Sequence, residues 1–166
     1  MTFSECYKIA LEMVDEDTTA TDTIVLDVIK NGVNQGYMLV ASTIDRKLKT
    51  LDEDFDKVIT LPSDVISIES VEHDNLGYLG KNDYKKVDNE LYLQTMGIDS
   101  GSLTITYAQF PPKLVADSDL LVLKDANCSI PAIYGAYKYS LNKRKYSASQ
   151  LLLAEFNSYF PSPVTK

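Results

Sequence analysis

The chain has 166 residues, of which 45% are hydrophobic and 10% aromatic, so it can build one ordinary core and is not globally disordered. Its net charge of −8 disfavours tight binding to nucleic acid, which relies on basic residues displacing counterions from phosphates. No segment approaches the roughly 18 uninterrupted apolar residues of a transmembrane helix, and the first residues lack the basic and apolar regions of a signal peptide. We therefore expect a protein of a cytoplasm-like compartment with no membrane partner.

Two helices are predicted in the first third of the chain. Residues 2–14 carry apolar side chains at three- and four-residue spacing, and a longer helix begins after Thr21 or Asp22 and continues to Leu51 with a similar period. Gly32 and Gly36 lie inside this second helix, four residues apart and therefore on one face. Their spacing leaves two interpretations open: a surface that lets another backbone approach closely, or a kink in the helix.

The middle third has the pattern of strands. Residues 57–61, 65–73, 91–94 and 102–108 are short segments rich in apolar and β-branched residues, and several alternate with polar residues. Asp88-Asn89 is typical of a hairpin turn, and Pro111-Pro112 ends strand pairing because proline has no N–H to donate. These segments predict a small antiparallel β unit.

Two further helices are predicted towards the end of the chain. One begins near residues 125–129 with Pro131 in its first turn, and Ser147 with Gln150 has the spacing of a capping box for the other. We therefore expect an α+β fold, in which a bundle of about four helices carries a small antiparallel β insertion between helices 2 and 3. A single domain would span 1–166, with a helical part at 1–55 and 115–160, a β insertion at 56–114 and a flexible tail at 161–166.

Motifs for catalysis or metal binding are scarce. The one histidine, His73, lies in a strand-like stretch beside a turn and is expected at the surface. Residues 52–56 begin like a calcium loop, but Lys57 stands where an EF-hand needs glycine and Ser63 where it needs glutamate. Neither a P-loop nor a dinucleotide-binding glycine motif occurs, and isolated cysteines such as Cys6 and Cys128 are typical small buried residues. We predict no enzyme activity, catalytic residue, cofactor or metal.

Tyrosines are unusually frequent, with 11 in a chain that has no tryptophan. Five of them lie in the last third: Tyr134, Tyr137, Tyr139, Tyr146 and Tyr159. Tyrosine is favoured at protein interfaces because it combines a large apolar area with a polar tip, but the same property suits packing at the rim of a core. Both interpretations stay open on the sequence alone.

The order of these features resembles the head–tail adaptor (connector) subunits of tailed bacteriophages. The similar stretches are residues 7–14, 33–37, 58–65, 103–107 with 110–112, and 133–139. Members of that family pair N-terminal helices, the second of them long, with a β insertion and then C-terminal helices. The resemblance covers most of the chain, and the β insertion here is longer than in the smallest adaptors.

The resemblance implies a virion structural protein that is assembled in the cytoplasm of the host bacterium. Twelve subunits commonly form a ring between the portal and the tail, with DNA passing through the channel, so its partners would be the portal, a tail or stopper protein and other copies of itself. The portal contact would lie at Phe156, Tyr159, Phe160 and Pro161. The two patches that a ring needs would include Gly32, Gly36, Tyr134 and Tyr137. The alternative is a cytoplasmic protein- or ligand-binding module without catalytic activity.

Overall fold

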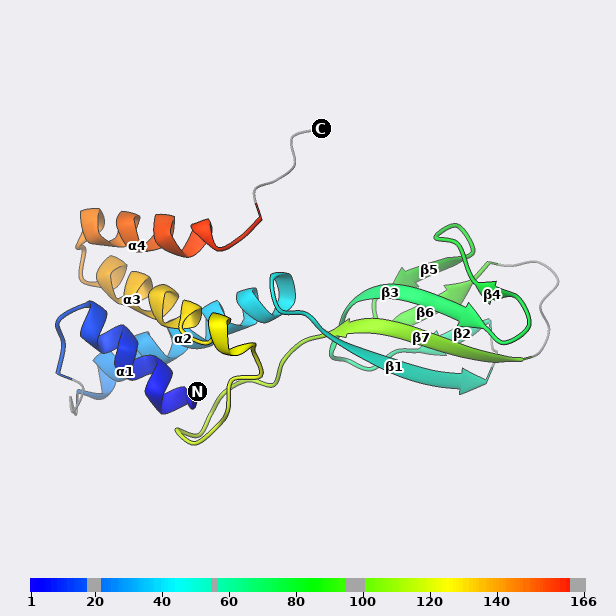
Figure 1. Cartoon of the computed structure of the whole chain (residues 1–166), viewed down its shortest axis with the longest axis horizontal. Helices are drawn as coiled ribbons and strands as arrows, with labels where there is room; N and C mark the ends of the chain where they lie inside the picture. The colour runs from blue at the N-terminus through cyan, green and yellow to red at the C-terminus, as the bar shows by residue number, and fades with distance from the viewer. Residues whose placement is uncertain (18–21, 55–56, 95–100, 162–166) are drawn as a thin grey trace. The chain divides into compact units, whose positions relative to one another are not determined.

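A computed structural model describes residues 1–17, 22–54, 57–94 and 101–161. The chain divides into two compact units (Figure 1). Each unit has its own hydrophobic core. The helical unit comprises Met1–Asp45 and Pro111–Lys166, and the β unit comprises Arg46–Phe110. The chain therefore leaves the helical unit once, forms the β unit and returns.

The helical unit contains α1 (Phe3–Met13), α2 (Thr23–Thr43), a short 3-10 helix η1 (Asp125–Asn127), α3 (Ile130–Asn142) and α4 (Tyr146–Ser158). Thr2 and Glu5 form a capping box at the start of α1, and the Asp22 carboxylate accepts a hydrogen bond from the backbone N–H of Ile24 at the start of α2. α3 packs against α1, α2 and α4 (Figure 1). It is therefore the central helix of this unit.

Two clusters of buried side chains hold the helices together. The larger joins α1, α2 and α3 through fully buried residues such as Leu11, Ile29 and Tyr37. The smaller joins α2, α3 and α4 through Val40, Ile130, Ile133 and Phe156. Only Ser149 and Phe156 of α4 are buried. α4 thus has the fewest buried residues of the four α-helices.

The β unit consists of two antiparallel sheets that share one hydrophobic core. Its strands are β1 (Lys47–Asp54), β2 (Val58–Thr60), β3 (Val65–His73), β4 (Gly77–Tyr78), β5 (Tyr84–Val87), β6 (Glu90–Leu93) and β7 (Ser102–Gln109). The first sheet has the order β1-β7-β3-β4 and the second the order β2-β6-β5. Ile59 and Leu91 from the second sheet pack with Val71, Leu103 and Ile105 from the first. The two sheets therefore stabilise each other across their buried faces.

The expectation of a helical bundle with a small β insertion is wrong. The described residues form four α-helices and seven strands in two antiparallel sheets, with 41% in helices and 27% in strands. The fold is a mixed α+β fold. Residues 47–51 continue the apolar spacing of the preceding helix although they belong to β1, and residues 77–78 and 84–87 are short strands without a clear strand pattern, so the sequence predicts only part of the β unit.

Several element boundaries differ from the expected ones. α2 ends at Thr43, not at Leu51, because Leu48 and Leu51 lie in β1, which pairs along its whole length with β7. The chain passes between its two units at residues 45–46 and 110–111, compared with the expected 55–56 and 114–115. The single-domain organisation stays a prediction. Of the expected flexible tail, residues 162–166 lie outside the described residues.

The strands and the remaining helices agree well with the sequence pattern. β2, β3, β6 and β7 lie at the expected places, and Asp88 has a positive φ of 51° in the turn between β5 and β6. The expected capping box at Ser147 is wrong, since α4 begins at Tyr146 after Lys145 and has no side-chain cap. Among the described residues, none of the helices is long and apolar enough to cross a membrane.

Candidate functional site

Gly32 and Gly36 allow a close helix contact within the chain. A Cβ atom added at Gly32 would lie 2.9 Å from the Cα of Gly135, and one added at Gly36 would lie 2.7 Å from the Cβ of Tyr134 and 3.1 Å from the Cα of Pro131. α2 and α3 can therefore approach this closely only because the two positions have no side chain. The sequence left open whether this glycine pair allows another backbone to approach closely or marks a kink in the helix. The contacts agree with close approach, and the approaching backbone is that of α3.

An aromatic cluster joins α3 to α4. Tyr134 lies edge-on to Tyr137, with ring centroids 5.3 Å apart, and it lies 4.8 Å from the ring of Phe156. Phe156 in turn lies 4.9 Å from Phe160. The ammonium group of Lys138 lies 5.3 Å from the centroid of Tyr134 and 5.7 Å from that of Tyr137. The aromatic contacts hold α4 against α3, and the Lys138 ammonium group lies over the rings of Tyr134 and Tyr137.

The residues expected at a portal contact differ strongly in their exposure. Phe156 is buried, with 2% of its surface exposed, and Phe160 is half-buried. Tyr159 is 47% exposed, and Pro161 is exposed too. Tyr159 and Pro161 are therefore accessible to a partner, whereas Phe156 positions α4 through the aromatic cluster.

A groove that the sequence pattern did not indicate lies beside the first turns of α4, with both apolar and polar side chains in its lining. The groove has a volume of about 380 Å³, and we call it the α4 groove. It is lined by Met13, Val14, Asp15, Ser140, Lys145, Ala148, Leu151 and Leu152. Leu151 is 73% exposed and Met13 is 41% exposed. Leu151 stays outside the core because α4 packs mainly against one helix, α3, and Leu151 lies on a face that this packing leaves exposed.

A second groove lies between α2 and α3, with a volume of about 350 Å³. We call it the α2–α3 groove. Its lining combines apolar, amide and basic groups: Val28, Asn31, Gly32, Gln35, Lys138, Leu141 and Asn142. Gly32, one of the expected subunit-contact residues, thus has one side against α3 and another at a groove that a partner can reach.

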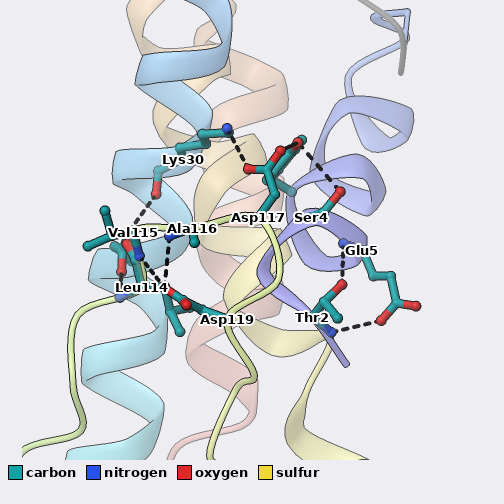
Figure 2. A network of polar contacts seen from close by, with 11 residues as sticks. Thr2, Ser4, Glu5, Lys30, Leu114, Val115, Ala116, Asp117 and Asp119 are labelled. Carbon is teal, nitrogen blue, oxygen red and sulfur yellow. Dashed lines mark hydrogen bonds and ion pairs between the residues drawn. The ribbon is translucent and has the colours of Figure 1, made fainter.

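A polar network holds residues 114–119, the segment that follows the β unit, against α1 and α2 (Figure 2). Asp117 accepts hydrogen bonds from Lys30 Nζ at 2.8 Å and from the Tyr7 hydroxyl at 2.9 Å. These two bonds lower the pKa of the Asp117 carboxyl. The Asn34 side chain donates to the backbone oxygen of Leu114 and accepts from its N–H, each at 2.9 Å. Because every partner here belongs to α1, α2 or this segment, the network positions the return of the chain.

Backbone bonds complete this attachment. The N–H groups of Phe3 and Ser4 donate to the carbonyl oxygens of Asp119 and Asp117. The Asp119 carboxylate accepts from the backbone N–H groups of Val115 and Ala116, at 2.7 and 2.8 Å (Figure 2). The start of α1 and the returning segment therefore hold each other in place.

The groups most relevant to chemistry are buried. The Cys6 thiol is fully buried, which raises its pKa to about 12, and Cys128 is buried beside it. Both cysteines thus lie in the core as expected. His73 was expected at the surface, but it is only 2% exposed, and its Nδ1 accepts a hydrogen bond from the backbone N–H of Asn75. It therefore supports the turn after β3.

Among residues 1–17, 22–54, 57–94 and 101–161, no group of three or more potential ligands is placed to hold a metal ion. Neither the family models nor the curated proteins searched give a match to this chain.

Proposed function

We propose that the chain is a non-enzymatic structural subunit, a head–tail connector adaptor of a tailed bacteriophage. In this role its copies form a ring, commonly of twelve subunits, between the portal and a tail or stopper protein. DNA passes through the channel of the ring. The element order of two helices, a β unit and two returning helices supports the resemblance to that family.

The observation that carries the proposal is the exposed apolar surface of α4. Leu151 and Met13 present large apolar side chains at the α4 groove, and Tyr159 is exposed near the other end of the helix. Exposed apolar side chains gathered at a groove are typical of protein–protein contact sites. We assign the portal contact to this surface, with Tyr159 and Pro161 touching the portal and Phe156 holding α4 in position.

A ring of identical subunits needs two different patches on each copy. The α2–α3 groove supplies a candidate for one of them, since it combines the apolar Val28 and Leu141 with the basic Lys138. Tyr137 lies beside Lys138 and is half-buried, so it can extend this patch. Gly36 is buried against α3 and contributes by keeping the two helices close.

The test is binding of the full chain to a portal protein from the same genome, measured by sedimentation. Replacing the exposed Leu151 by glutamate should weaken binding at least about tenfold, because a charge would enter the apolar contact. Leu76→Glu is the matched control, since Leu76 is 58% exposed but belongs to the β unit. Circular dichroism should show an unchanged fold for both variants. Equal portal binding by Leu151→Glu and wild type would refute the assigned surface, and no binding by wild type would refute the function.

A further inference from the structure

The outer edge of β1 is open among the described residues. β1 forms one side of its sheet and pairs only with β7, from Lys47 with Gln109 to Asp54 with Ser102. Seven of its eight residues are exposed, and Leu51 alone is half-buried. A strand of this length with free N–H and C=O groups is a template for pairing with another strand.

The charges on β1 are separated along the strand. Lys47 and Lys49 lie in its first half, and Asp52, Glu53 and Asp54 lie in its second half. Lys47, Lys49 and Glu53 share one face with Leu51, because side chains alternate along a strand. That face carries Leu51 into the hydrophobic core of the β unit. Its other three residues are exposed.

We propose that β1 pairs with β1 of a second copy of this chain, antiparallel and about a two-fold axis. Antiparallel pairing brings the basic half of one strand beside the acidic half of the other. Parallel pairing in register would instead place like charges together, which is unfavourable. The charge pattern therefore favours one direction of pairing and disfavours the other.

The geometry of a continuous sheet restricts the possible registers. In an antiparallel pair, directly opposite residues point to the same face of the sheet. A two-fold axis perpendicular to the sheet must therefore pass through the centre of one residue pair, in which a residue lies opposite its own copy. Near the middle of β1 this leaves Thr50 opposite Thr50, or Leu51 opposite Leu51. In both registers Glu53 of one copy contacts Lys47 and Lys49 of the other, one of them directly opposite and one diagonal.

The competing explanation is that these charges protect the edge from pairing at all, as charged residues do on many edge strands. Protection works when the approaching strand carries the same charge at the same place. Here the strand is complementary to itself in the antiparallel direction. The ion pair of Lys49 with Asp64 is long, at 3.9 Å, so Lys49 can turn towards a second copy. The two explanations predict different states of association.

The experiment is sedimentation equilibrium of the full chain from about 1 to about 500 µM, at low and high salt. Wild type should associate in pairs, and salt should weaken the association. Glu53→Lys alone, and Lys47→Glu with Lys49→Glu in one variant, should each weaken it about tenfold or more, because every altered contact occurs twice about the axis. Lys85→Glu with Lys86→Glu in one variant, and Glu12→Lys, change exposed residues elsewhere by the same amounts of charge and are the matched controls.

Mixing supplies the decisive result. The Glu53→Lys variant and the Lys47→Glu, Lys49→Glu variant should combine one to one, since every contact in the mixed pair joins opposite charges. A gain of association on mixing also shows that both variants are folded. Absence of pairing in wild type, or of any recovery on mixing, would overturn the proposal. The pairing uses only the β unit, so it does not depend on the proposed ring or on portal binding.

Discussion

The close contact between α2 and α3 makes a strong prediction about Gly36. Alanine at this position would place a Cβ atom 2.7 Å from the Cβ of Tyr134 and 3.1 Å from the Cα and carbonyl oxygen of Pro131. None of these atoms belongs to the far end of a flexible side chain, so the helices must separate. Overpacking costs up to about 3 kcal/mol, while alanine gains about 1 kcal/mol over glycine in a helix. We expect Gly36→Ala to lower the free energy of unfolding by about 2 kcal/mol.

Urea unfolding followed by circular dichroism at 222 nm measures this effect on the helical unit. Gln35→Ala is the matched control, because Gln35 is the preceding residue of the same helix and is exposed. It should change the free energy of unfolding by less than about 0.5 kcal/mol. If Gly36→Ala were instead stabilised by about 1 kcal/mol, as an alanine in open space would be, the described packing of α2 on α3 would be wrong.

Three further predictions concern titratable groups. Burial raises the pKa of Cys6 from 9.0 to about 12, so a disulfide reagent should modify this thiol at pH 8 only as fast as the protein opens. Hydrogen bonds from Lys30 and Tyr7 lower the pKa of Asp117, so the stability advantage of wild type over Asp117→Asn should hold at neutral pH and shrink below about pH 3.8. Burial, then a hydrogen bond to Glu16, raises the pKa of Tyr139 from 10.0 to about 12, so stability should fall more steeply between those pH values in wild type than in Tyr139→Phe.

Local patterns predicted those elements whose sequence period agrees with their packing. The helix at α1 and the strands at β3 and β7 have apolar residues at the spacing that their buried faces require. β1 is different, because Leu48 and Leu51 continue the helical spacing of α2 almost without interruption. Pairing with β7, whose residues lie 48 to 62 positions further along the chain, decides its conformation. No local pattern reports such a long-range contact.

The candidate site shows the same limit. Tyrosine frequency pointed to the α3–α4 region, but it could not separate the half-buried Tyr134 and Tyr137 from the buried Tyr139. Phe156 and Leu151 are both apolar residues of one helix, and only the packing of α4 on α3 buries the first and exposes the second. Whether a side chain is exposed therefore depends on which other helices pack against its own helix. The sequence pattern of a single helix does not predict this packing.

Electron microscopy of the full chain mixed with portal protein from the same genome tests the central claim most directly. The proposal predicts a ring of this protein seated on one end of the portal, with the helical unit at the contact and an open channel along the axis. Leu151→Glu should reduce the number of portals that carry such a ring. Portals that stay bare at concentrations well above micromolar, together with a chain that forms no ring, would contradict the account.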